Sequence, residues 1–125
     1  MLLDRMLPQG GWNYGNTVVL GVTLKPQVQP SGLALAALAG EPEAAEHVRR
    51  SLQYLHQALS ARTTAASLAY GLIGAAAHGP RPPSAGAWLE AAYRRTVRRD
   101  ASPHRLALLA LAAGEHFPWV LSSKF

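Results

Sequence analysis

The chain has 125 residues, which is enough for one domain with a real but modest core. It contains no cysteine, and this excludes disulfides, thiolate metal sites and a cysteine nucleophile. Ten arginines and two lysines against seven acidic residues give a net charge of +5, a balance that can attract nucleic acid or an anionic membrane.

The first 30 residues differ in character from the rest of the chain. Turn-forming residues surround two large aromatics in the segment Gly10-Gly-Trp-Asn-Tyr-Gly15, which predicts a loop. Val18–Leu24 fits either a short strand or a helical turn, and Pro26-Gln-Val-Gln-Pro30 is typical of an extended linker. We therefore divide the single domain into residues 1–30, which carry a helix end, this loop and the linker, and residues 31–125.

From residue 31 onward the pattern predicts five helices of two alternating kinds. Alanine and leucine make up about a third of the chain, and both favour helix. Three segments are small or apolar nearly all round and must be covered on every side: Ser31–Ala39, Ala65–Ala77 and Arg105–Ala113. Two amphipathic segments, Glu43–Leu59 and Ser84–Arg99, lie between them, each with one apolar stripe at helical spacing.

The three apolar segments also resemble one another in sequence. When they are aligned on Leu33, Leu68 and Leu106, the spacings are 35 and 38 residues, a period typical of helix-pair repeats. We therefore predict an all-α fold, an α/α toroid-like array of helix hairpins that forms a partial ring. The apolar helices would form its inside and the amphipathic helices its outside.

The segment Gly10-Gly-Trp-Asn-Tyr-Gly15, a proline-bounded linker and the helix that begins at Ser31 together resemble the repeat of the prenyltransferase and squalene-cyclase superfamily. The resemblance covers about residues 9–40 as a motif and most of the chain as architecture. It implies an α/α toroid in which a Gly-rich, Trp-containing loop joins successive hairpins. It also implies an isoprenoid lipid held in a cavity between the inner helices, as in a terpenoid cyclase (an isomerase) or a prenyltransferase.

The catalytic motifs of that superfamily are not found in this chain. Its cyclases protonate their substrate with an Asp-x-Asp-Asp motif, whereas the aspartates here are Asp4 and Asp100 alone. Its protein prenyltransferases bind zinc through Asp, Cys and His, and this chain has no Cys. The Gln that precedes Gly-x-Trp by several residues in the cyclases is here Gln9, directly beside Gly10. We therefore expect the C-terminal or a truncated portion of a toroid, with catalytic residues that stay unknown and neither a metal nor another cofactor.

Three aromatic residues are candidates for lining a substrate pocket: Trp12, Tyr14 and Tyr70. Aromatic faces stabilise carbocations, which would suit isoprenoid chemistry. The alternative for Trp12 and Tyr14 is structural, since a large aromatic ring can also fix a loop against helix ends. Both roles are open on the sequence alone.

The clearest basic cluster lies near the end of the second amphipathic segment and consists of Arg94, Arg95, Arg98 and Arg99. It could bind the phosphate of a lipid headgroup, of a diphosphate or of RNA, or it could be a solvated outer face. No aromatic platform accompanies it, so we expect no nucleic acid as a partner.

The longest small or apolar stretch, Ala65–Ala77, is well short of a membrane span, and no leader pattern opens the sequence. We expect a cytoplasmic protein, with contact to a membrane surface open. An incomplete ring leaves an apolar edge, so we expect self-association or docking to the remainder of a longer toroid. The alternative to an enzyme part is a non-catalytic helical-repeat scaffold that binds another protein.

Overall fold

The structure is a computed structural model that describes residues 6–7, 10–13, 18–19, 22–23 and 25–114. This part of the chain is all-α apart from two strands of two residues each. The helices are α1 (Val28–Ala37), the 3-10 helix η2 (Pro42–Ala44), α2 (Ala45–Ala58), α3 (Ala65–Ala76), α4 (Ala85–Arg99) and α5 (Pro103–Ala113). The all-α prediction is therefore confirmed, and the helices follow in the predicted order.

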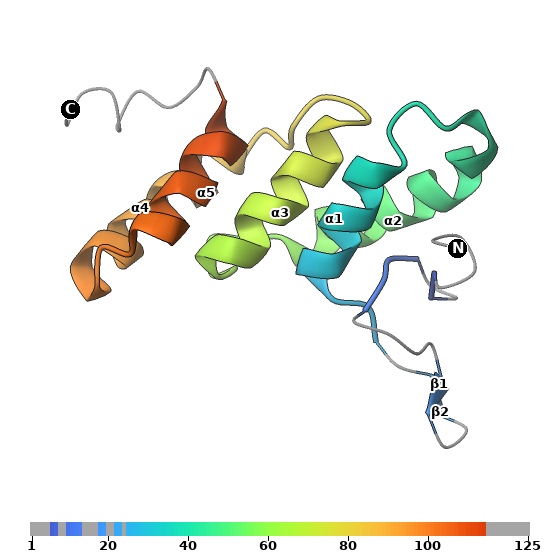
Figure 1. The fold of residues 1–125 in the computed structure, drawn as a ribbon, viewed down its shortest axis with the longest axis horizontal. Helices are drawn as coiled ribbons and strands as arrows, with labels where there is room; N and C mark the ends of the chain where they lie inside the picture. The colour runs from blue at the N-terminus through green and yellow to red at the C-terminus, as the bar shows by residue number, and fades with distance from the viewer. Residues whose placement is uncertain (1–5, 8–9, 14–17, 20–21, 24, 115–125) are drawn as a thin grey trace.

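The segment that the sequence left undecided contains a short β-hairpin. Strand β1 (Val18–Val19) pairs with β2 (Val22–Thr23) in antiparallel fashion, with Val18 opposite Thr23 and Val19 opposite Val22. Of the two alternatives considered, the described residues thus take the strand. The hairpin precedes α1 and lies apart from the helices (Figure 1).

The start of α1 differs from the predicted one. Helix α1 begins at Val28, so the extended linker predicted to run to Pro30 ends three residues earlier. A proline is tolerated in the first turn of a helix because the N–H that it lacks has no partner within the helix there. Helix α5 begins at Pro103, a residue favoured at the first helical position, and the Ser102 hydroxyl before it accepts a hydrogen bond from the backbone N–H of Arg105.

The helices form two layers (Figure 1). Helices α1, α3 and α5 lie side by side as one row, since α3 packs against both α1 and α5. Helices α2 and α4 lie behind this row, where α2 contacts α1 and α3, and α4 contacts α3 and α5. We call α1, α3 and α5 the inner row. The three apolar segments therefore share one layer and the two amphipathic segments the other.

The core lies between the two layers. The largest side chains that are completely or almost completely buried there are leucines that come from both layers: Leu35, Leu55, Leu68, Leu72, Leu89 and Leu109. Burying one such side chain stabilises the fold by about 1.5–3 kcal/mol, so these leucines are the main favourable contribution of the core. On α4 the buried stripe is Ala85, Leu89, Ala92 and Thr96, and Trp88 beside it is half-buried against the core.

Glycines allow α1 and α3 to approach more closely than they could if side chains lay at their contact. A Cβ on Gly32 would overlap the backbone of Tyr70, and a Cβ on Gly74 would lie 2.7 Å from the Cα of Gly32. Both contacts are too short for real atoms. Gly32 and Gly74 therefore permit the close approach of the two backbones at the contact between α1 and α3.

Candidate functional site

The Gly-Gly-Trp loop packs against the helices through buried residues. Trp12 is only 3% exposed and belongs to the core, so it occupies the structural position considered for it. Gly10 and Gly11 have φ angles of 97° and 79°, which favour glycine. A Cβ on Gly10 would also lie 2.7 Å from the backbone oxygen of Arg50 in α2. Tyr14, the second aromatic of this loop, is outside the described residues.

Two buried serines hold this loop, and the sequence analysis missed both. The Ser31 hydroxyl in α1 accepts a hydrogen bond from the N–H of Trp12 at 2.7 Å. The Ser51 hydroxyl in α2 accepts one from the N–H of Gly11 at 2.9 Å. The only signal that could have found them is their position, since each is a polar residue on the buried side of its helix.

The inner row leaves one apolar face uncovered by α2 and α4. On α3 the residues Ala66, Tyr70 and Ile73 repeat at helical spacing and are half-buried, whereas Leu68 and Leu72 between them are fully buried. At the two ends of the row, Leu33 of α1 is 48% exposed and Leu111 of α5 is 70% exposed. We call these five residues, Leu33, Ala66, Tyr70, Ile73 and Leu111, the open face. Of the predicted pocket residues, Tyr70 lies on it and Trp12 does not.

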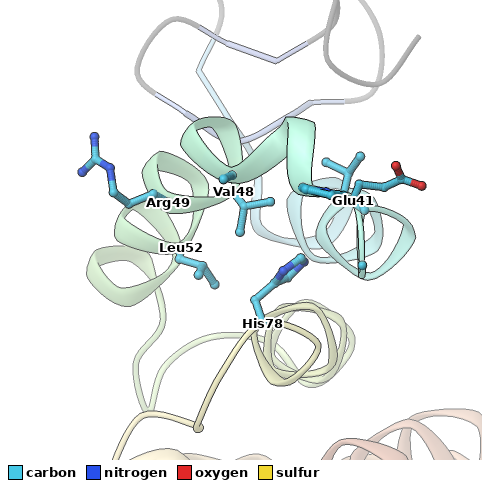
Figure 2. A pocket seen from close by; sticks show the side chains of 9 residues that line it. Glu41, Val48, Arg49, Leu52 and His78 are labelled. Atoms are coloured by element: carbon cyan, nitrogen blue, oxygen red, sulfur yellow. The ribbon is translucent and has the colours of Figure 1, made fainter.

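A pocket of about 510 Å³ lies where α1 ends, α2 begins and the chain leaves α3 (Figure 2). Its walls are largely apolar, and Leu38, Val48 and Leu52 line it. Figure 2 shows the carboxylate of Glu41 and the guanidinium of Arg49 directed away from the space between Leu52 and His78. Arg49 is instead paired with Glu46 at 2.6 Å on the surface of α2.

His78 is the ionisable group whose ring faces this pocket. Its Nε2 lies 2.6 Å from the backbone oxygen of Leu35, so the ring links the end of α3 to α1 and Nε2 carries the donated proton. This hydrogen bond connects two neighbouring helices of the inner row. The pocket therefore offers an apolar wall with one engaged imidazole, a composition suited to holding an apolar group rather than to proton transfer.

The four arginines predicted as one anion-binding face are used in different ways. Arg94 pairs with Glu90 one turn earlier at 2.8 Å. Arg95 donates to the backbone oxygens of Ala61 and Thr63, at 2.6 and 2.9 Å, and so fixes the loop between α2 and α3. Arg98 and Arg99 are exposed at the end of α4. The cluster is therefore divided between surface pairing, loop fixing and free cationic ends.

A second pocket, of about 430 Å³, brings part of this cluster together with an arginine from α5. Arg95 and Arg99 line it with Arg105, beside Thr64 and Thr96. Sequence reasoning missed Arg105 because it belongs to the next helix and follows Arg99 only through the turn at Asp100. Arg94 and Arg98 do not line this pocket.

Two negative observations apply to the described residues alone. Among them, no group of three His, Asp or Glu side chains is placed to hold a metal ion. None of the helices in that part of the chain is both long enough and apolar enough to cross a bilayer.

Comparison with known proteins gives no match at any level. No protein-family model, no curated protein and no solved structure matches this chain.

Proposed function

We propose that this chain forms part of the wall of an α/α toroid whose inner row contacts a large apolar ligand of the isoprenoid class. Two observations support the proposal. The Gly-Gly-Trp loop and the helix that follows it resemble the prenyltransferase and squalene-cyclase repeat, and the inner row has an open face. That face carries the proposal: an apolar layer that no other described helix covers is a natural ligand or partner surface.

Several features of the open face support an apolar ligand over a polar one. No charged residue belongs to it, and its one aromatic residue, Tyr70 of α3, is half-buried. Burying the exposed parts of Leu33 and Leu111 against a ligand would contribute about 25 cal/mol for each Å² removed from water. The close contact of Gly32 and Gly74 packs α1 directly against α3, the two helices that carry Leu33 and Tyr70.

The role proposed for this chain is binding and enclosure of the ligand. Any acid that starts a cyclase reaction, or any zinc site of a transferase, would come from elsewhere in such a ring, because the motifs for both are missing from this sequence. If the ligand is another protein instead, the same surface belongs to a non-catalytic scaffold. The apolar composition of the open face permits that alternative.

Binding of a fluorescently labelled isoprenoid alcohol, together with radiolabelled squalene, tests the proposal. We expect saturable binding that Leu33→Asp and Leu111→Asp each weaken roughly tenfold or more, since a carboxylate would be desolvated by the apolar ligand. The matched control is Ala87→Asp, which adds the same charge on the exposed face of α4, opposite the buried Leu89.

Two results would count against the proposal. One is the absence of binding by a chain whose circular dichroism shows intact helices. The other is an equal loss of binding in Ala87→Asp, which would indicate a non-specific effect of charge. Further Gly-Gly-Trp repeats and an Asp-rich motif in the flanking coding sequence would favour the enzyme over the scaffold.

A further inference from the structure

We infer that the pocket of about 430 Å³ between α3, α4 and α5 is a binding site for a phosphate group, as inorganic phosphate or as a phosphomonoester. This site is separate from the open face, so the inference does not rest on the proposed isoprenoid ligand. Its lining residues come from the beginning of α3, the C-terminal half of α4 and the first turn of α5.

The charge of the pocket is strongly one-sided. Arg95, Arg99 and Arg105 line it, and its lining within the described part of the chain includes no Asp or Glu. Asp100 pairs with Arg105 at 3.0 Å and offsets one of the three charges. The two hydrogen bonds of Arg95 go to neutral backbone oxygens, so its charge is not offset. The surplus of two positive charges favours a dianion over a carboxylate.

Arg99 is the one arginine of this pocket that has no partner among the described residues. Among the residues that the structure describes, its guanidinium has neither a hydrogen-bond acceptor nor an ion-pair partner. An arginine presents five donors in a planar fork that fits two phosphate oxygens at once. Arg95 is already fixed by the loop and Arg105 by Asp100, so a ligand that enters the pocket would meet two arginines in set positions and one that is free to adjust.

Polar groups at the pocket wall complement the arginines. Thr64 precedes α3, and its hydroxyl makes no capping hydrogen bond to that helix, so it is free to donate to a ligand. Ala65 and Ala66 line the pocket and belong to the first turn of α3, whose backbone N–H groups have no acceptor within the helix. These donors add to the arginine set and do not define the site by themselves.

Adjacent arginines of α4 provide a matched pair of test variants. Arg99→Ala removes a lining residue, whereas Arg98→Ala removes a neighbouring exposed arginine that does not line the pocket. Phosphate would be titrated at constant ionic strength and followed by calorimetry and by the thermal midpoint. We expect Arg99→Ala to raise the Kd for phosphate about tenfold or more, with Arg98→Ala within about twofold of wild type. Without phosphate, both should melt at the wild-type temperature.

Co-sedimentation with vesicles that carry phosphatidic acid distinguishes a free phosphate from a lipid headgroup. Vesicle binding that only Arg99→Ala abolishes supports the site and identifies a headgroup as its source. Phosphate binding without vesicle binding supports the site and identifies a small ligand. Equal effects of the two variants in both assays, or no binding of phosphate and vesicles by the folded wild type, would overturn the inference.

Discussion

The hydroxyl of Ser31 holds the backbone of Trp12 on both sides: it accepts from the Trp12 N–H at 2.7 Å and donates to the Trp12 carbonyl at 3.1 Å. Ser31 is fully buried in α1 and Trp12 is 3% exposed, so neither water nor another side chain can easily replace these bonds. A second bond, from the N–H of Gln27 to the same carbonyl, joins the loop to the residue before α1. The Gly-Gly-Trp loop is thus an integral part of the helical layer.

This relationship predicts the effect of Ser31→Ala. The change leaves the N–H of Trp12 without its acceptor in a buried position, and such a group costs about 1–3 kcal/mol of stability. Chemical denaturation followed by tryptophan fluorescence and by circular dichroism would measure the loss. Ser67→Ala is the matched control, since Ser67 lies in α3 without a hydrogen bond from its side chain in the described structure. A Ser31→Ala variant as stable as that control would contradict the prediction.

Gly74→Ala and Gly86→Ala are expected to change stability in opposite directions, because only Gly74 lies in the contact of α1 with α3. Gly74→Ala places a Cβ against the backbone of Gly32, which cannot move aside without shifting a helix. We expect a loss of about 3 kcal/mol or failure to fold, at the upper end of overpacking effects. Gly86→Ala meets nothing within 4 Å and should gain about 0.5–1 kcal/mol from helix propensity. Thermal denaturation of both variants checks the difference in sign.

The sequence predicted the helices well because two of them carry an apolar stripe at helical spacing and three are small or apolar nearly all round. Small residues all round Ala65–Ala77 predict cover on every side, whereas α3 has neighbours in both layers but stays only half-buried at Ala66, Tyr70 and Ile73. The same reasoning did not decide Val18–Leu24, because a short apolar run bounded by turn residues fits a strand or a helical turn equally. It also ended the linker at Pro30, although a proline is acceptable in a first helical turn.

The candidate sites were less predictable, because they depend on contacts between distant segments. The guanidinium of Arg95 donates hydrogen bonds to the carbonyls of Ala61 and Thr63, more than 30 positions earlier in the chain. No local sequence pattern indicates that contact. Arg81 likewise donates to the carbonyl of Ala112 at 3.1 Å and so stabilises the C-terminal end of α5. A cluster of arginines in the sequence gives the total charge of a region, whereas the fold decides which charges remain free for a ligand.

Exposed leucine at the end of the inner row predicts self-association of the isolated chain. Leu111 of α5 is 70% exposed, and Val97 of α4 is 45% exposed. We expect light scattering to give a mass above 13.3 kDa that rises with concentration. Leu111→Ser should lower this mass, whereas Ala87→Ser on the exposed face of α4 should leave it unchanged. A wild-type chain that stays monomeric at all concentrations would contradict this prediction.

The position of Tyr54 predicts a loss of stability at alkaline pH. This residue of α2 is half-buried, and a Cβ on Gly11 would lie 3.0 Å from its ring. Burial raises the pKa of the Tyr54 phenol above its ordinary value of 10.0, because the phenolate is poorly solvated there. The folded chain therefore keeps this proton when the unfolded chain has begun to lose it. The resulting stabilisation is complete below about pH 10 and decreases as the pH rises through the pKa of the folded state.

Tyr54→Phe provides the measurement for this prediction. The free energy of unfolding would be determined for the wild type and Tyr54→Phe from pH 8 to about pH 11, a range that includes the ordinary tyrosine pKa. Lysines also titrate in this range, but they do so in both proteins and cancel in the difference. We expect the wild type to lose stability relative to Tyr54→Phe only above about pH 10. A difference that stays constant across the range would mean that the Tyr54 phenol ionises equally well in the folded and unfolded chains.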